Sequence, residues 1–126
     1  MVKVKDFLTN VQHIADANPR YDKGGDGRGG RCDCIGLIIG ALRSCGYRWD
    51  GLHGSNWAAR KEMRMAFDIL DESSLLPGMI VFKYHDPFEA GYGLPARYQN
   101  GPDLRDYYHA GVVMEAHPLK ILHCTS

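Results

Sequence analysis

The sequence predicts one α+β domain, in which helices come first along the chain and an antiparallel sheet follows. Apolar residues recur at the spacing of an α-helix in three separate segments before residue 72. After residue 76 this period gives way to short apolar runs separated by turn residues, as expected for strands. The 126 residues contain no repeats or low-complexity linkers, which favours a single domain with its own hydrophobic core.

The first helix is predicted over residues 3–16, where the apolar positions form one stripe. Asn18-Pro19 ends it, because the residue before a proline disfavours helical backbone. Residues 20–32 then hold five glycines and few apolar side chains. This composition predicts a loop whose backbone can approach a neighbouring element closely.

The second helix is predicted over residues 33–45, and its apolar positions indicate that most of it is buried. Asp33 is a plausible N-cap and Gly46 a plausible C-terminal cap. Gly36 and Gly40 each cost about 1 kcal/mol relative to alanine inside a helix, which predicts close packing at these positions. A third helix is predicted over residues 56–71. One side of it would carry Trp57, Met63, Ala66, Phe67 and Leu70.

Three strands complete the predicted fold. Residues 77–84 form a turn that leads into the first strand, residues 107–116 the second, and residues 119–126 the third. Between the first two lies a polar loop, residues 85–106, that contains three prolines and several aromatic residues. A loop of this length in a compact domain often has a function.

Composition excludes several classes of partner. The formal net charge is zero, because 15 lysines and arginines balance 15 aspartates and glutamates, and this gives no support to binding of nucleic acid or a membrane surface. No apolar run approaches the roughly 20 residues that cross a bilayer. Asp6 and Gln12 interrupt the N-terminal segment where a secretory signal would be apolar. We therefore expect no signal peptide, no nucleic acid and no membrane partner.

Four cysteines in a chain without a secretory signal indicate reduced thiols rather than a disulfide framework. A disulfide that joins Cys124 to Cys32 or to Cys34 is the less favoured alternative. Cys32 itself has no role that the sequence assigns.

The sequence places Cys34 in the first turn of the second predicted helix. Amide N–H groups and the helix dipole favour negative charge at such a position, and the thiolate is the nucleophilic form of cysteine. A nucleophilic cysteine also needs a base, usually histidine, and a third polar group that orients the base. His109 and His123 lie on neighbouring predicted strands, where a hairpin would bring them side by side. The small residues Ala110 and Gly111 leave room for another element.

Each of these residues has a structural alternative. A cysteine in an apolar helix is more often a small core residue than a nucleophile, and a histidine at a strand end is more often a surface or core residue. A zinc site would draw on Cys32, Cys34, His123 and Cys124, but their spacing is not a common zinc pattern. The glycine-rich loop lacks the phosphate-binding pattern of a P-loop, and no strand precedes it.

Five motifs in a fixed order resemble the NlpC/p-sixty family of cell-wall peptidases, which are papain-related cysteine peptidases. The motifs are YDKGG from Tyr21, DCIGL from Asp33, LLPGMIVF from Leu75, HAGVVME from His109 and ILHCTS from Ile121. Each motif is weakly specific by itself, whereas the ordered set is specific. The resemblance is strongest to the phage and prophage branch, whose lytic enzymes accumulate in the host cytoplasm or travel in the virion and act on the bacterial cell wall.

The resemblance implies a role for each site residue. Cys34 would be the nucleophile, His109 the general base and His123 the third polar residue. Tyr21 would lie beside the nucleophile, and Asp33 would contact the free amine of a peptidoglycan stem peptide. The implied reaction is hydrolysis of an amide bond in that stem peptide, with no metal and no cofactor.

Two departures from the family pattern qualify these expectations. Ile35 stands where most members have a serine, which puts the substrate preference in doubt. Most members also continue past the third polar residue with further strands, whereas this chain stops at Ser126. The sequence therefore predicts a C-terminally truncated papain-like fold with an exposed sheet edge, through which a homodimer could form. The alternatives to a peptidase are a catalytically impaired wall-binding or scaffold module, and an amidase or acyltransferase with the same cysteine and histidine.

Overall fold

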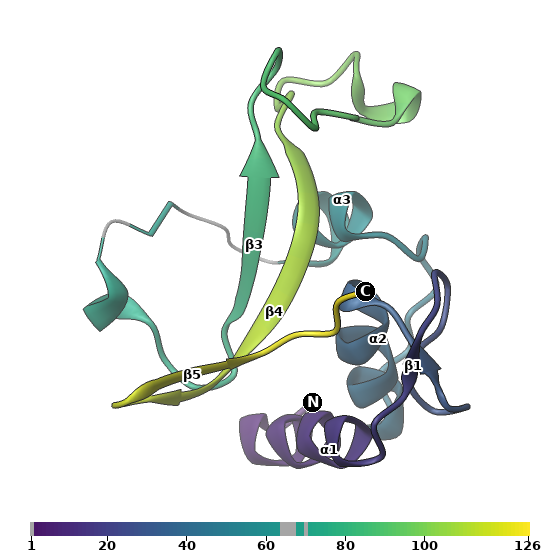
Figure 1. Cartoon of the computed structure of the whole chain (residues 1–126), viewed down its shortest axis with the longest axis vertical. Helices are drawn as coiled ribbons and strands as arrows, with labels where there is room; N and C mark the ends of the chain where they lie inside the picture. The colour runs from purple at the N-terminus through teal and green to yellow at the C-terminus, as the bar shows by residue number, and fades with distance from the viewer. Residues whose placement is uncertain (1, 64–67, 70) are drawn as a thin grey trace.

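The computed structural model describes residues 2–63, 68–69 and 71–126 of the chain. Within these residues two long helices, α1 (Val4–Asp16) and α2 (Cys34–Ser44), pack beside an antiparallel sheet of β3 (Ile80–His85), β4 (Asp106–Ala116) and β5 (Leu119–Leu122). Figure 1 shows the helices on one side of the long curved strand β4, with the C-terminus returning to the start of α2. The predicted α+β class is confirmed.

None of the helices in the described residues has the length and apolar character that a membrane crossing requires.

The first two helices form where the sequence predicts them. α1 buries Phe7, Val11 and Ile14, which repeat at helical spacing, against the buried stretch 35–41 of α2. The Asp33 side chain accepts a hydrogen bond from the Gly36 amide and so caps α2, as its position before the helix predicts. These helices bring the first residue of α2 to a fixed place against the sheet.

Gly36 and Gly40 face the backbone of the glycine-rich loop, which confirms the close packing that the sequence predicts. A Cβ atom at Gly36 would collide with the carbonyl oxygen of Gly25, and one at Gly40 would collide with that of Asp26. The loop also contains two short strands, β1 (Arg20–Tyr21) and β2 (Arg31–Cys32), which pair in parallel. Residues 20–32 are therefore more regular than predicted, because each end of the loop hydrogen-bonds to the other.

The three predicted strands form an antiparallel meander in the order β3-β4-β5. Ala110 and Val112 of β4 belong to the core that packs against α2. β5 pairs with β4 only as far as Leu122, so the predicted strand over residues 119–126 is too long. His123 and the residues after it run instead toward α2.

The third predicted helix, over residues 56–71, is confirmed at its start, over residues 56–62, but it is wrong at Met63 and at residues 68, 69 and 71. A single helical turn, α3 (Ser55–Trp57), continues into a wider π-helical turn, η1 (Ala58–Glu62), and Met63 is already extended. The Met63 amide bonds to the Ala58 carbonyl, five residues back, and this wide turn ends the helix. Residues 64–67 and 70 lie outside the described residues; residues 68, 69 and 71 are not helical.

A short helical turn, η2 (Glu72–Ser74), precedes β3. The long segment between β3 and β4 contains another, η3 (Ala96–Tyr98). Its end is anchored by the buried carboxylate of Asp106, which accepts hydrogen bonds from the Asn56 side chain and the Gly93 amide. Arg60 donates to the carbonyls of Asp103 and Arg105. These contacts give the segment a defined path over the end of the sheet.

Candidate active site

Cys34 is the first residue of α2 and lies against β4. The backbone amides of Ala110 on β4 and of Ile35 on α2 both point at its sulfur, and the side chain is half-buried. The small side chain of Ala110 is what lets the start of the helix approach the strand this closely. The structure thus brings the predicted nucleophile to the strand position that directly follows His109.

Burial raises the pKa of the Cys34 thiol above its ordinary value. The amides of Ala110 and Ile35 act in the opposite direction, while the negative charge of Asp33 adds to the increase. In this arrangement the loss of solvent outweighs the effect of the two amides, which favours the protonated thiol at rest. A base has to take the proton before the sulfur can act as a nucleophile.

His109 and His123 form the closest polar contact of the site. The Nε2 atom of His109 lies 2.7 Å from Nδ1 of His123, and the two rings meet nearly edge to face, with an interplanar angle of 78°. The absence of a side chain at Gly111 permits this contact, since a Cβ atom there would lie 3.4 Å from the Cβ of His123 and 3.3 Å from the Leu122 carbonyl oxygen. The predicted proximity of the two histidines is confirmed, although His123 lies just past the end of β5 and not on a strand.

No hydrogen bond joins Cys34 to His109 among the residues that the structure describes. The sulfur lies near the amide that follows His109, whereas the imidazole bonds to His123. Nδ1 of His109 has no hydrogen-bond partner among the described side chains. The thiol at the start of α2 therefore lies beside the β4 residue that follows the base, with no hydrogen bond to the base itself.

The two histidines open onto a cleft of about 240 Å³. Its walls are largely apolar and include Phe82, Ala110 and Ile121, with the exposed Lys83 at its side. Burial, His123 and Lys83 all lower the pKa of His109. The imidazole is thus kept neutral near pH 7, which is the form that accepts a proton.

Both carboxylate oxygens of Asp33 already accept hydrogen bonds within the protein, although the predicted role of Asp33 is to contact the amine of a substrate. One oxygen accepts from the Gly36 amide at 2.7 Å and the other from the Gly24 amide at 2.8 Å. His53 Nε2 lies 2.9 and 2.8 Å from the same two oxygens. Burial opposes ionisation, but the bonds from His53, Gly24 and Gly36 prevail and lower the pKa of Asp33. The carboxylate is a structural centre of the loop, and a substrate amine would have to displace His53 from it.

His53 is the one member of this site that sequence reasoning missed. It lies in the connection between α2 and α3, 20 residues after its partner Asp33, and no periodic pattern marks it. The only signal available is a polar residue in a segment of glycine and serine, which is too weak to assign a partner.

Tyr21 lies at the edge of the same site. β1 pairs with β2 so that Tyr21 is opposite Cys32, and this places its hydroxyl in the electrostatic field of Cys34, Asp33 and Cys124. Burial, followed by these negative charges, raises the pKa of Tyr21. The tyrosine therefore stays protonated and can donate a hydrogen bond near the nucleophile.

A metal site does not form here among the residues described: no three His, Cys, Asp or Glu side chains converge as ligands. This includes the cysteines and His123 that the sequence offers as zinc ligands.

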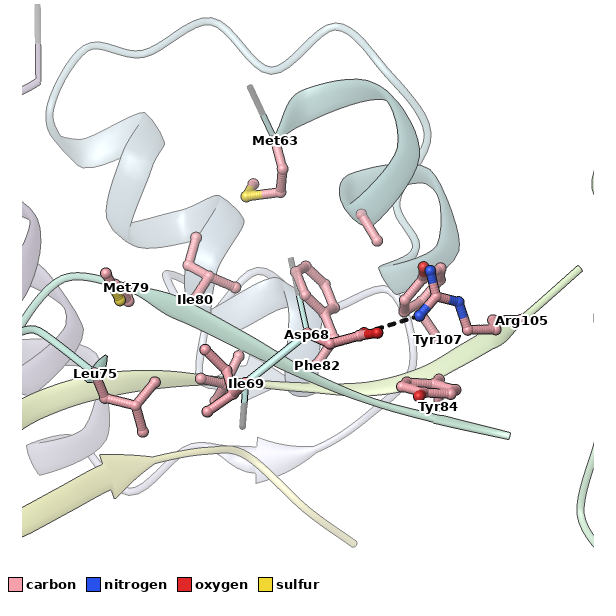
Figure 2. Close-up of a pocket in the computed structure, with 12 residues that line it drawn as sticks. Met63, Asp68, Ile69, Leu75, Met79, Ile80, Phe82, Tyr84, Arg105 and Tyr107 are labelled. Atoms are coloured by element: carbon pink, nitrogen blue, oxygen red, sulfur yellow. Dashed lines mark hydrogen bonds and ion pairs between the residues drawn. The ribbon is translucent and has the colours of Figure 1, made fainter. Parts of the chain in front are cut away.

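A larger cleft, of about 710 Å³, lies on the other side of β3 and is shown in Figure 2. Apolar side chains such as Ile80 and Phe82 line it, and an ion pair between Asp68 and Arg105, 3.0 Å long, lies at its edge. No cysteine or histidine is among the residues that line it. Its chemistry therefore gives no reason to place a reaction there, despite its size.

Comparison with family models, curated proteins and solved structures finds no match to this chain.

Proposed function

We propose that this chain is a papain-like cysteine hydrolase of the NlpC/p-sixty type, which cleaves an amide bond in the stem peptide of peptidoglycan. The observation that carries this proposal is the arrangement on β4: His109 bonds to His123, and the amide of the next residue, Ala110, lies near enough to the Cys34 sulfur to lower its pKa. A thiol, an imidazole and a third polar group on adjoining elements are the parts that nucleophilic catalysis by cysteine needs.

The contact with His123 suits His109 to act as the base. If Nε2 of His109 donates to Nδ1 of His123, then Nδ1 of His109 carries the lone pair and is the atom available to the thiol. This is the tautomer that catalysis requires, and the hydrogen bond from His109 to His123 selects it. His123 thereby acts as a positioning residue.

The raised pKa of Cys34 and the lowered pKa of His109 favour a neutral pair at rest. The proton then moves from sulfur to Nδ1 of His109 as the sulfur attacks the substrate carbonyl. For this step, rotation of the two side chains brings the thiol and the imidazole into hydrogen-bonding distance. Water excluded by a bound peptide would strengthen the attraction between the resulting thiolate and imidazolium.

The start of α2 can stabilise the charge that develops on the substrate. The Cys34 amide lies in the first turn of the helix, where backbone N–H groups lack partners within the helix. In the attack, the sulfur forms a bond to the carbonyl carbon and the oxygen becomes an anion, which these N–H groups stabilise. His109 then protonates the leaving amine, and water hydrolyses the acyl-enzyme to release the acid and restore the thiol.

A catalytically impaired wall-binding module is the second candidate. It is favoured by the absence of a hydrogen bond between Cys34 and His109 in the described residues and by the raised pKa of the thiol. Such a module would keep the fold and bind the wall without releasing new ends from it.

The deciding experiment is digestion of purified peptidoglycan, followed by identification of new amino and carboxyl ends by mass spectrometry. Wild-type protein should release stem-peptide fragments, and Cys34→Ser should release none. Cys45→Ser is the matched control, because Cys45 ends α2 and its sulfur accepts only from the Asn10 side chain. Sedimentation with the wall but no new ends in wild type would support the binding module instead. New ends produced equally by Cys34→Ser would exclude both the nucleophile and the proposed reaction.

A further inference from the structure

Cys32 and Cys124 are in direct contact, although 92 residues separate them in the chain. The Cys124 sulfur lies 3.2 Å from the carbonyl oxygen of Cys32, and the two thiols are near enough for each to shift the pKa of the other. Cys32 is completely buried on β2, whereas Cys124 is partly exposed beyond the end of β5. The proposed hydrolase mechanism uses neither sulfur.

The position of this contact links the two halves of the candidate active site. Cys32 precedes Asp33, which caps the helix of Cys34, and Cys124 follows His123. The residues after β5 are held to the rest of the protein by few other contacts: His123 bonds to His109, and Thr125 bonds only to Ser126. The two thiols are thus the main attachment of the C-terminal segment to the loop before α2.

We propose that Cys32 and Cys124 form a thiol–disulfide exchange site, which a small disulfide such as oxidised glutathione converts into an intramolecular disulfide. The contact distance and the difference in exposure carry this proposal. It does not depend on the hydrolase activity, since neither cysteine is placed in the reaction.

The exchange has two steps that balance. The thiolate of the more exposed Cys124 attacks one sulfur of oxidised glutathione, which forms a mixed disulfide and releases one glutathione. The Cys32 sulfur then attacks the Cys124 sulfur and displaces the second glutathione. The protein loses two hydrogens, and the oxidant is reduced to two glutathione thiols that take up both protons. Cys32 needs no access to solvent, because the sulfur that it attacks already lies beside it.

Cys34 is the competing partner of Cys124. The Cys124 thiol donates a hydrogen bond to the backbone of Cys32, whereas its effect on Cys34 is only the weak, long-range influence of its charge on the Cys34 pKa. Burial raises the pKa of Cys32 to about 12, and it also raises that of Cys124. Exchange should therefore be slow at neutral pH and faster in mildly alkaline buffer, because the thiolate is the attacking form.

The test is a disulfide map of the folded full-length chain after reaction with oxidised glutathione. Trypsin cleaves after Arg31, Arg43 and Lys120, so Cys32 and Cys34 remain on one peptide, residues 32–43, and Cys124 on another, residues 121–126. The map is therefore recorded for wild type, for Cys34→Ser and for Cys32→Ala. Free thiols are alkylated in acid-quenched samples before digestion.

Wild type and Cys34→Ser should both give the two peptides joined with the loss of two hydrogen masses, and Cys32→Ala should not. The oxidised forms should also melt at a higher temperature than the same proteins after reduction. A cross-link that disappears in Cys34→Ser but persists in Cys32→Ala would overturn the proposal in favour of the Cys34 pair. Glutathione that stays on Cys124 of wild type, with Cys32 alkylated after unfolding, would also overturn it.

Discussion

The Nε2 atom of His109 lies 2.7 Å from Nδ1 of His123, and 14 residues separate these two histidines in the chain. Gly111 of β4 lies between them in the chain, and a Cβ atom there would come within 3.0 Å of the Ile121 side chain and 3.3 Å of the Leu122 carbonyl oxygen, so the glycine allows the end of β5 to lie close to β4. The contact fixes which nitrogen of His109 faces away from its partner. It is therefore the feature of the site whose loss should be most informative.

Replacement of His123 should lower activity without unfolding the protein, because the side chain is exposed. In His123→Ala we expect kcat on a peptidoglycan substrate to fall by about 10²-fold, since His109 loses the partner that selects its tautomer. His123→Asn keeps an acceptor and should recover part of this loss. His13→Ala, at an exposed position on α1, is the control and should leave kcat unchanged. Equal activity of His123→Ala and wild type would remove His123 from the mechanism.

Lys83 should set the pH at which activity begins. Its charge lowers the pKa of His109, after the larger effects of burial and of His123. Lys83→Gln should therefore raise that pKa. Because the base works in its neutral form, the acid limb of kcat/KM should move to higher pH by the same amount. NMR titration of His109 measures the shift directly, with Lys120→Gln, on the exposed face of β5, as the control.

Most of the fold could be predicted because its elements follow from local pattern. The stripe of Phe7, Val11 and Ile14, the cap at Asp33 and the apolar runs of β3 and β4 each act within a few residues. The early end of the third helix could not be predicted, since the wide turn over Ala58–Glu62 depends on a backbone bond pattern that periodicity does not encode. The end of the third strand at Leu122 could not be predicted for the same reason, because the apolar pattern does not show where strand pairing stops.

The candidate site was predictable only in part, for the same physical reason. Cys34 and His109 lie at the ends of elements, and the hairpin brings His123 to His109, so chain order and topology are enough to propose them. His53 meets Asp33 through an irregular connection that no repeat describes. The raised pKa of Cys34 depends on how much solvent the packed fold excludes, and that quantity is not visible before the fold is known.

The Cys34 thiol should ionise at a higher pH than an ordinary cysteine. Burial raises its pKa, so the rate of reaction with iodoacetamide should reach half of its maximum above the ordinary cysteine value of about 8.5. The measurement is adduct formation on the peptide of residues 32–43 as a function of pH, with Cys34→Ser to subtract any contribution of Cys32. A midpoint well below pH 8.5 would show that a thiolate–imidazolium pair already exists in the free protein.

Gly36 should tolerate no side chain. A Cβ atom there would collide with the Gly25 carbonyl oxygen, and backbone cannot move aside as a flexible side chain can. Gly36→Ala should therefore lower the free energy of unfolding by about 1–3 kcal/mol, despite the better helix propensity of alanine. Gly29→Ala is the matched control, because nothing lies within 4 Å of the added atom. Urea unfolding measures both, and equal stability of the two variants would disprove the close contact.

Asp33 should make the free energy of unfolding depend on pH in the acidic range. Burial alone would raise its pKa, but the bonds from His53, Gly24 and Gly36 lower it below the unfolded value of about 3.9. A lowered pKa means that the unfolded chain binds the proton more readily, so the contribution of Asp33 to stability is present above about pH 4 and lost as the pH falls below it. Asp33→Asn should be less stable than wild type at pH 7, by about 1–2 kcal/mol for a lost charged cap. The difference should shrink toward pH 3, because the unfolded wild-type chain then gains free energy by binding a proton that the folded carboxylate resists. Asp6→Asn, at an exposed site on α1, should show neither effect, and a pH-independent difference for Asp33→Asn would mean that its charge does not stabilise the fold.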